Sequence, residues 1–442
     1  MRKIDVLCCV VAFLLNVGMY AQTTDTPATV VTDSVQEDTI PWEVRVKCSL
    51  DTMVYEAIDA PFTLGLAVYD LTADTLFYAF NEQKVLRPAS TQKLLTSITA
   101  LSVLGGTHEY RTKAYYTGSL NVKDSTLNGD VYVVGDFDPT YTYNNLCDIA
   151  SKFVGLGIRN VKGGIYADIS MKDSLLYGKG WCWDDVPSNY EPYLGALLFN
   201  RGQNGPESTK YSRDPNFRPW LHFVKTLGDV LMQKGVTAFD ENGDTLQAFV
   251  YGTRMLPAKQ PTRCFYTSRT TVEKVLQRTL KNSDNLYAES LFWKLARQAK
   301  NKGCTAKDGI RQIETVLRKA NASLSGVEIA DGSGVSLYNY HSANTQIAML
   351  RYAYLNENIF KYLYPALPVS GKDGTLSKRM TTGNVQGNVH AKTGTLEGVS
   401  SLSGYINAPN GHILAFSIII NGVLRNKTGQ DFQDRVCNIL AQ

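Results

Sequence analysis

The sequence predicts a mixed α/β protein whose central sheet takes strands from both ends of the chain and is interrupted by an inserted α+β segment. Two patterns carry this prediction. Alternating apolar runs near residues 62–80 and 390–420 enclose a middle rich in helical periodicity, and short strand-like runs between Gly and Asp turns begin near residue 111. The chain has 442 residues, of which 44% are hydrophobic and 19% charged, which suits two or three ordinary globular domains.

The first residues are typical of a targeting segment. Two basic residues precede an apolar run from Leu7 to Val17, which is too short to span a bilayer. We therefore predict a signal peptide over residues 1–21, cleaved before Gln22, and an exported, periplasmic protein. An uncleaved N-terminal anchor is the alternative. Residues 22–42 are rich in Thr, Asp, Val and Pro without periodicity, which predicts a flexible linker.

The main domain is expected in two parts, residues 43–110 and 265–442. In the first part a hairpin pattern precedes Pro88, and the helix that follows stops at Gly105-Gly106. The predicted strands are 62–69, 76–80, 390–406 and 413–420, and the predicted helices are 90–101, 270–280, 285–300, 307–320 and 430–440.

Residues 111–264 are expected to form the inserted domain. Gly and Asp turns separate its short apolar runs, and two stretches have helical periodicity. The predicted strands are 115–120, 127–134 and 164–167, and the predicted helices are 145–155 and 220–235.

Composition argues against several classes of function. The net charge is +4 and no Lys/Arg run reaches five residues, so the sequence indicates no nucleic-acid partner. The eight cysteines form no CxxC pair, and the five histidines show no HxxxH or HExxH spacing. We therefore predict no metal and no cofactor. Disulfide pairing, oligomeric state and peripheral association with a membrane stay open.

Ser90 and Lys93 begin the first predicted helix. Their spacing of three places both side chains on one helical face. A serine hydroxyl needs a base to become a nucleophile, and a desolvated lysine can be neutral enough to serve as one. Taken alone the pattern is weak, because both residues are common on helices.

Ser283-Asp284-Asn285 lies between two predicted helices. A loop serine there can relay a proton between lysines, and the Asn amide can bind a substrate carbonyl. The structural alternative is a helix cap, which Ser and Asn favour. A second SxN, Ser119-Leu120-Asn121, lies in an expected turn and shows how common the pattern is.

Lys392-Thr393-Gly394-Thr395 opens a predicted strand. A glycine at this edge lets a substrate backbone approach, as in strand addition, and Lys392 with Thr395 can bind a terminal carboxylate. A second KTG at 427–429 is expected in a solvated loop. The three patterns SxxK, SxN and KTG, in this order and in these contexts, are those of β-lactamases and penicillin-binding proteins.

The chain resembles the class C low-molecular-mass penicillin-binding proteins, the D-alanyl-D-alanine carboxypeptidase/endopeptidase family. The resemblance runs from about residue 55 to the C-terminus. Segments beyond the three motifs also match: 129–135, 163–168, 180–185, 331–336 and 368–376.

The resemblance implies a serine β-lactamase/transpeptidase-like domain, with a central antiparallel sheet and helices, plus the inserted domain. It implies Ser90 as acylated nucleophile, Lys93 as base and Ser283 as proton relay. Asn285 would orient substrate or water. The other implied roles are D-Ala carboxylate binding by Lys392, Thr393, Gly394 and Thr395, an oxyanion hole from the N–H groups of Ser90 and Thr395, and further substrate contacts by Asp168 and Ser333. Peptidoglycan stem peptides would be substrates and β-lactam antibiotics inhibitors.

Departures from the family pattern indicate an altered side-chain preference. Leu337 and Glu397 stand where relatives that cleave diaminopimelate cross-links often carry Arg and Gln. Residues 205–219 are too few for the third domain that the family often nests there. The alternatives are a β-lactamase or esterase, a penicillin-binding scaffold with little turnover, and chance motifs. Glu314 is the nearest candidate for a class A deacylating glutamate and lies in a regular predicted helix, which argues against a β-lactamase.

Overall fold

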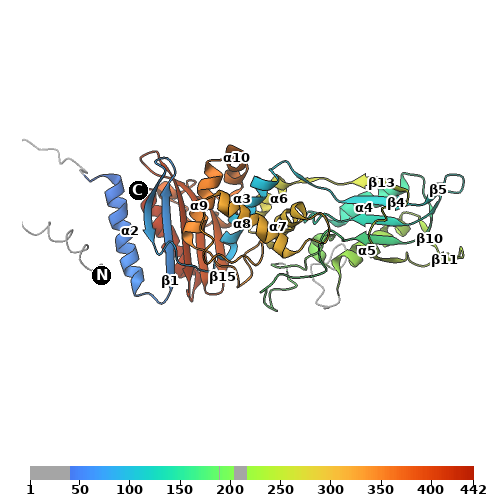
Figure 1. Cartoon of the computed structure of the whole chain (residues 1–442), viewed down its shortest axis with the longest axis horizontal. Coiled ribbons are helices and arrows are strands. Elements are labelled where there is room, and N and C mark those ends of the chain that lie inside the picture. The colour runs from blue at the N-terminus through green and yellow to red at the C-terminus, as the bar shows by residue number, and fades with distance from the viewer. Residues whose placement is uncertain (1–39, 189, 204–216) are drawn as a thin grey trace, which may run out of the picture. The chain divides into compact units, whose positions relative to one another are not determined.

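One five-stranded antiparallel sheet joins the two ends of the chain (Figure 1). The computed structural model describes residues 40–188, 190–203 and 217–442. The strand order is β15-β16-β17-β1-β2, so the N-terminal hairpin pairs with the last strand of the sequence. The strands are β1 (Thr63–Asp70), β2 (Thr75–Phe80), β15 (His390–Leu396), β16 (Val399–Asn407) and β17 (Ile413–Asn421). This confirms the predicted fold class.

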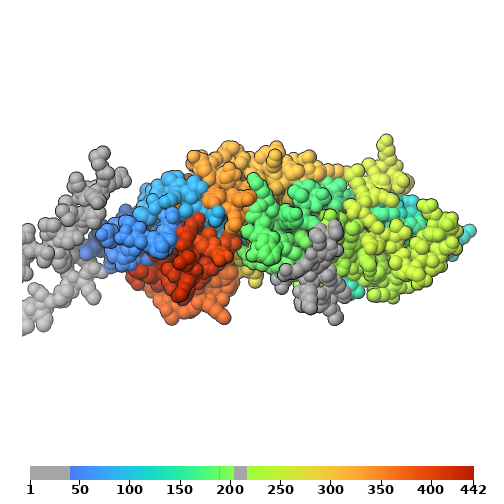
Figure 2. Space-filling view, turned by 90° about the horizontal axis from the view of Figure 1, so that it is seen from below, coloured from blue at the N-terminus to red at the C-terminus, as the bar shows by residue number. Residues whose placement is uncertain are grey.

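The two faces of this sheet carry separate apolar cores. Leu66 and Val68 pack with α2 (Trp42–Ile58) and α11 (Asn426–Leu440), whereas Ala67 between them packs with the central helices. This is the two-residue alternation of a strand that is buried on both faces. Figure 2 shows the C-terminal segment, in red, beside the N-terminal helix, in blue.

A layer of helices covers the face that carries Ala67. Its centre is α3, whose residues from Gln92 to Leu101 are all buried, as expected of a helix inside a core rather than at its surface. The helices of this layer are α3 (Gln92–Val103), α6 (Val272–Lys281), α7 (Asn285–Ala299), α8 (Ala306–Lys319), α9 (Ala343–Tyr354) and α10 (Glu357–Ala366).

The inserted segment leaves and rejoins the main domain through a two-stranded pair, β3 (Glu109–Tyr110) and β14 (Thr270–Thr271). It has its own apolar core and two further five-stranded sheets, of order β12-β9-β7-β4-β13 and β11-β10-β8-β6-β5. The predicted boundary at 264 stays a prediction. Pairing of β13 with β4 as far as Thr267 favours a boundary a few residues later.

The elements of the insertion are short. The strands are β4 (Lys113–Thr117), β5 (Ser119–Asn121), β6 (Thr126–Asn128), β7 (Val131–Val134), β8 (Asn160–Lys162), β9 (Ile165–Asp168), β10 (Thr237–Phe239), β11 (Thr245–Leu246), β12 (Tyr251–Thr253) and β13 (Thr262–Thr267). The helices are α4 (Tyr143–Val154) and α5 (Pro219–Gln233).

The structure corrects several local predictions, among them the strands predicted over 115–120 and 127–134, each of which is two shorter strands. The strand predicted over 390–406 is two strands, because Gly398 has φ +72° and turns the chain between β15 and β16. The second KTG lies in the first turn of α11 rather than in a loop, and the second SxN lies in β5 rather than in a turn. Helix α2 was not predicted, although its buried residues, Val46, Leu50, Met53, Val54 and Ala57, follow a helical stripe.

The predicted signal peptide lies outside the described residues, as do almost all of the predicted linker and most of the segment 205–219. Within the described ranges, every helix is too short or too polar to cross a membrane. The cysteines of these ranges, all six between Cys48 and Cys437, are free.

Candidate active site

Ser90 and Lys93 meet at the start of α3. The short turn η1 (Ala89–Thr91) leads into the helix, and Lys93 Nζ donates to Ser90 Oγ at 2.9 Å. The Ser90 residue is 6% exposed and Lys93 is fully buried. The predicted sharing of one helical face therefore becomes a direct hydrogen bond.

Lys93 Nζ contacts two further oxygens, Asn285 Oδ1 at 2.6 Å and the Ser333 carbonyl at 2.6 Å. An ammonium group has three protons for these three acceptors. A neutral amine has two protons and one lone pair, so one partner must then donate. Amide and carbonyl oxygens cannot donate, whereas the Ser90 hydroxyl can. When Lys93 loses its proton, the arrangement directs its lone pair to the Ser90 proton.

The electrostatic setting brings this deprotonation close to neutrality. Burial lowers the pKa of Lys93 to about 8, against the opposing effect of the carboxyl groups of Glu191, Asp331, Glu289 and Asp284. These acids come from the insertion, from the segment before α9 and from α7 or its N-cap. The desolvated interior is therefore the main reason why this lysine can act as a base.

Lys392 and Ser283 form a second pair. Lys392 Nζ donates to Ser283 Oγ at 2.8 Å and to the Thr393 carbonyl at 2.6 Å. Burial, followed by the positive charge of Lys93, lowers the pKa of Lys392 well below its usual range. Ser283 has φ +56° and Ala89, which precedes Ser90, has φ +49°. Both are left-handed conformations that cost energy in residues other than glycine, and such strain is concentrated at functional sites.

Gly394 lets β15 lie against the turn that carries Ser90. A Cβ atom there would stand 2.8 Å from the Pro88 carbonyl oxygen and 2.1 Å from Ser401 Oγ. The glycine thus has a packing reason in addition to the substrate approach predicted from sequence. Thr393 Oγ1 donates to Thr375 Oγ1 at 2.8 Å, and Thr395 is exposed.

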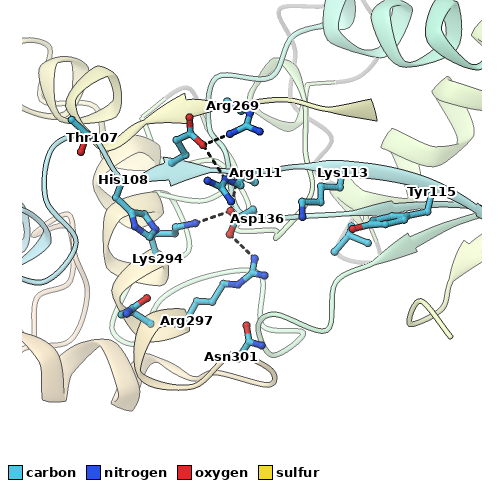
Figure 3. A pocket seen from close by; sticks show the side chains of 13 residues that line it. Thr107, His108, Arg111, Lys113, Tyr115, Asp136, Arg269, Lys294, Arg297 and Asn301 are labelled. Atoms are coloured by element: carbon cyan, nitrogen blue, oxygen red, sulfur yellow. Dashed lines mark hydrogen bonds and ion pairs between the residues drawn. The ribbon is translucent and has the colours of Figure 1, made fainter. Parts of the chain in front are cut away.

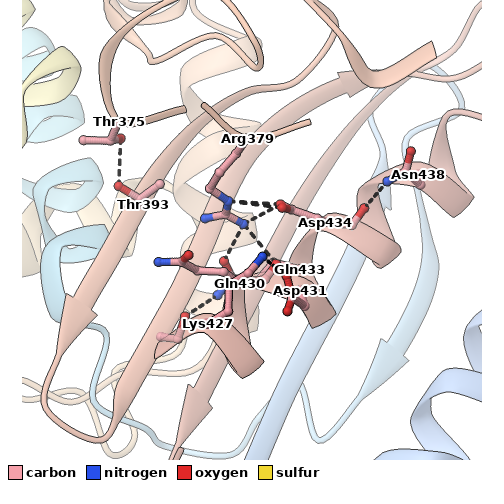
Figure 4. A network of polar contacts seen from close by, with 10 residues as sticks. Thr375, Arg379, Thr393, Lys427, Gln430, Asp431, Gln433, Asp434 and Asn438 are labelled. Atoms are coloured by element: carbon pink, nitrogen blue, oxygen red, sulfur yellow. Dashed lines mark hydrogen bonds and ion pairs between the residues drawn. The ribbon is translucent and has the colours of Figure 1, made fainter. Parts of the chain in front are cut away.

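The second KTG is placed differently. In Figure 4, Thr393 lies on its strand beside Thr375, whereas Lys427 lies on α11 and pairs with Asp431. The Lys427 side chain is 76% exposed. Only the first KTG contributes to the buried lysine pair.

A buried scaffold fixes the Ser333 carbonyl. Glu289 Oε1 accepts the N–H groups of Gly332 and Ser333 at 2.9 and 2.8 Å, and Thr96 Oγ1 donates to the Gly332 carbonyl at 2.7 Å. Burial raises the pKa of Glu289 to about 8. The predicted site residue Ser333 therefore reaches the site through its backbone carbonyl, which binds Lys93.

Residues of the insertion bind the SxN segment at the start of α7. Asn285 Nδ2 donates to the Tyr190 carbonyl at 3.0 Å. Asp284, the N-cap of α7, binds Arg201 at 2.7 Å and Arg278 at 2.8 Å. The segment therefore also caps a helix, as the structural alternative predicted. The capping residue is Asp284, whereas its neighbours Ser283 and Asn285 bind Lys392 and Lys93.

Three residues of this site were missed by sequence reasoning. Glu289 stands four residues after Asn285, so helical spacing could have placed it on the same face. Tyr190 and Glu191 lie in an irregular segment whose sequence shows neither helical nor strand periodicity. Glu191 is fully buried, and neither of its carboxyl oxygens has a hydrogen-bond partner in the described part of the chain. Burial raises its pKa well above the usual range.

Asp168 is not brought to this site. It ends β9, where its two carboxylate oxygens accept the backbone N–H groups of Ser170 and Leu256, each at 2.9 Å. The predicted contact of Asp168 with substrate receives no support from this placement. The two positions that depart from the family pattern are also placed by the structure. The Leu337 carbonyl accepts a hydrogen bond from Arg87 Nε at 3.1 Å, and Glu397 is exposed in the turn after β15.

Comparison with known proteins decides the family. The sequence pattern of the D-Ala-D-Ala carboxypeptidase 3 (S13) family matches residues 52–217 and 251–442, which is most of the chain. The chain belongs to this family. The S13 member described here is thus a serine-type D-Ala-D-Ala carboxypeptidase by descent, as its resemblance implied.

Individual relatives agree. A D-alanyl-D-alanine carboxypeptidase from Actinomadura sp. strain R39 is 28% identical over 423 residues, covering 81% of this chain and 77% of the relative. The D-alanyl-D-alanine carboxypeptidase DacB from Haemophilus influenzae is 24% identical, covering 81% and 85%. The crystal structure of penicillin binding protein 4 from Haemophilus influenzae has a TM-score of 0.76 at 21% identity, covering 89% of this S13 chain and 99% of that one. The last comparison shows a shared fold.

Proposed function

We propose that the chain removes terminal D-Ala from peptidoglycan stem peptides, cleaves D,D-cross-links between them, or does both, through an acyl-enzyme on Ser90. The observation that carries the proposal is the 2.9 Å contact between Lys93 Nζ and Ser90 Oγ in a site where burial lowers the pKa of the lysine to about 8. A buried amine beside a serine is the arrangement that activates this nucleophile.

In acylation, neutral Lys93 takes the Ser90 proton as Oγ attacks the carbonyl of the penultimate D-Ala. The backbone N–H groups of Ser90 and Thr395 are assigned to the developing oxyanion, where one lost donor typically costs about 2.7–4 kcal/mol. Ser283, bonded to Lys392, relays this proton from Lys93 to the departing amine, which leaves Lys93 neutral. The C–N bond breaks, the terminal D-Ala leaves as a neutral amine, and the acyl group stays on Ser90.

Substrate orientation is assigned to the KTG strand. The carboxylate of the terminal D-Ala would bind Lys392 and the hydroxyls of Thr393 and Thr395. Asn285 is held at both ends of its amide, since its Oδ1 binds Lys93 and its Nδ2 binds the insertion, and the second Nδ2 hydrogen can be donated to the substrate backbone. Neutral Lys93 then takes a proton from the attacking water and gives it to Ser90 Oγ as the bond between the acyl carbon and Oγ breaks, which releases the peptide as a carboxylic acid.

β-Lactams should form a long-lived acyl-enzyme. Structures of relatives include penicillin binding protein 4 from Haemophilus influenzae complexed with a β-lactam. Glu314, the candidate for a deacylating base, lies on α8 within 4.0 Å of Arg318 and half-exposed, in regular helix as predicted. We assign it no role in hydrolysis, and the chain is proposed to be exported to the periplasm, where peptidoglycan lies.

The departures at Leu337 and Glu397 support an altered preference for the stem-peptide side chain. Leu337 offers no charge to a diaminopimelate carboxylate, and Glu397 adds a negative one near the end of β15. Leu337→Arg should raise cleavage of diaminopimelate-containing peptides relative to lysine-containing ones. An unchanged ratio would contradict this assignment.

The decisive experiment is the intact mass of the purified protein with and without penicillin, followed by release of D-Ala from a peptide that ends in D-Ala-D-Ala. Ser90→Ala should abolish both the adduct and the release. Ser97→Ala is the matched control, because Ser97 is a buried serine on the same helix and should retain both. An adduct without release would favour a penicillin-binding scaffold, and no adduct at all would refute an acyl-serine site.

A further inference from the structure

A second cavity lies at the other end of α7, away from the catalytic side chains. It has a volume of about 620 Å³ and is lined by the last turns of α7 and by the segments through which the chain enters and leaves the insertion (Figure 3). This volume falls within the range of small-molecule sites. None of the catalytic residues proposed above lines it.

The cavity wall carries an excess of positive charge. Arg111, Lys113 and Arg269 come from the insertion and its connecting strands, and Lys294 and Arg297 come from α7. Only two carboxylates, Glu109 and Asp136, line the same cavity. With His108 neutral, five cations face two anions, so the wall has a net charge of +3.

Each carboxylate is shared by two cations. Glu109 binds Arg111 at 2.9 Å and Arg269 at 2.8 Å. Asp136 binds Lys294 at 2.6 Å and Arg297 at 2.5 Å, and it also accepts the backbone N–H of Arg111 at 2.6 Å. Its side chain is only 4% exposed, so the acid is saturated and cannot serve another cation.

Donors remain after these pairs are formed. Each guanidinium has five N–H groups, and the structure gives one contact from the side chain of each of the three arginines, to Glu109 or Asp136. Lys113, which points into the cavity in Figure 3, has no hydrogen-bond or ion-pair partner in the ranges that the structure describes. Arginine forks bind planar carboxylates and phosphates in two-pronged fashion.

We propose that this cavity binds a small anion that carries two or more negative charges on carboxylate or phosphate groups. Such an anion would neutralise the excess charge and accept from both sides of the cavity. Arg111, Lys113 and Arg269 would hold it from the insertion side, and Lys294 with Arg297 from α7. It would thereby join the insertion to the helix whose first residue is Asn285.

The cavity is separate from the proposed catalytic centre. Lys294 and Arg297 lie nine and twelve positions after Asn285 on α7. At 1.5 Å per residue this is a distance of roughly 14 to 18 Å along the helix. Binding there does not require an acyl-enzyme, so the inference stands apart from the proposed function.

Titration calorimetry at constant ionic strength tests the inference, with pyrophosphate and citrate as phosphate and carboxylate probes. Constant ionic strength is needed because salt screens exposed charges. Arg111 and Arg269 have side chains 52% and 58% exposed, so the double variant Arg111→Gln/Arg269→Gln should fold. The matched control is Arg254→Gln/Arg263→Gln, which removes two exposed arginines of the insertion that lie outside the cavity.

The wild-type chain and the control should bind at least one probe saturably, with one site. The cavity variant should bind about tenfold more weakly or worse, because hydrogen bonds to charged groups are strong. Tighter pyrophosphate binding assigns the site to phosphates, and tighter citrate binding assigns it to carboxylates. No saturable binding of either probe, or an equal loss in the control, overturns the proposal. Thermal melts without anion check that each variant is folded.

Discussion

The rate of acylation at Ser90 should rise with pH through about 8. Only the neutral form of Lys93 can accept the serine proton, and burial lowers the pKa of this lysine to about 8. A base with that pKa is about 9% neutral at pH 7, about 50% at pH 8 and about 90% at pH 9. Acylation should therefore be about fivefold faster at pH 8 than at pH 7 and should level off by pH 9, provided that the protein stays folded.

Substitution separates the base from the rest of the site. Lys93→Arg keeps the positive charge but cannot lose a proton near neutral pH, so acylation should fall by about 10²–10⁴-fold and lose its rise with pH. Lys427→Arg, the same change in the second KTG, should leave rate and profile unchanged because that side chain is 76% exposed on α11. The assay is the second-order rate of labelling by a fluorescent penicillin between pH 6 and 9.5. A flat wild-type profile, or a Lys93→Arg variant that labels at the wild-type rate, would refute the assignment of Lys93 as base.

Three further predictions follow from contacts near or outside the site. Gly394→Ala should slow acylation and destabilise the fold by about 1–3 kcal/mol, because its Cβ would meet Ser401 Oγ at 2.1 Å; Gly252→Ala, whose nearest contact is 3.6 Å, should do neither in the same labelling and urea assays. Asp168→Asn should lower stability by about 1–3 kcal/mol in urea unfolding, since one backbone N–H loses its acceptor, yet leave KM for the peptide unchanged; a raised KM would restore the substrate role predicted from sequence. Burial lowers the pKa of His341 to about 4, so between pH 6.5 and pH 4 the unfolded chain binds a proton at this residue that the folded chain does not. The free energy of unfolding should therefore fall by about 3 kcal/mol over this pH range. The variant His341→Gln should flatten this part of the stability profile.

The sequence was sufficient for the parts of the site that depend on short spacing. Ser90 and Lys93 lie one helical turn apart, so their contact follows from the helix itself. That one sheet takes strands from both ends of the chain was predictable, because both ends carry largely apolar strand-length runs, and β1 indeed pairs with β17. The strand predicted as one piece over 390–406 shows the limit, since the turn at Gly398 lies between two equally apolar runs.

Contacts between distant segments could not be predicted in this way. The Ser333 carbonyl reaches Lys93 from 240 positions away, and the Tyr190 carbonyl reaches Asn285 from the insertion. A backbone carbonyl leaves no mark in the residue type that carries it. Asp168 shows that residue type alone does not fix a role, because its carboxylate accepts two backbone N–H groups, and its predicted contact with substrate stays a prediction.

In the proposed mechanism, the two buried lysines give the substrate's carboxylate a role in the chemistry as well as in binding. Lys93 and Lys392 lie close enough for the charge of Lys93 to lower the pKa of Lys392, and such coupling acts equally in the other direction. One proton is therefore held more easily than two. The acids nearest to Lys93 favour placing it there, whereas Lys392 has only the Ser283 hydroxyl and a carbonyl as partners in the described chain. A terminal carboxylate bound at Lys392 reverses this balance, because an opposite charge within a few ångströms favours the charged lysine. Charge on Lys392 then favours neutral Lys93, so a peptide that ends in a carboxylate would prepare the base that activates Ser90 against it.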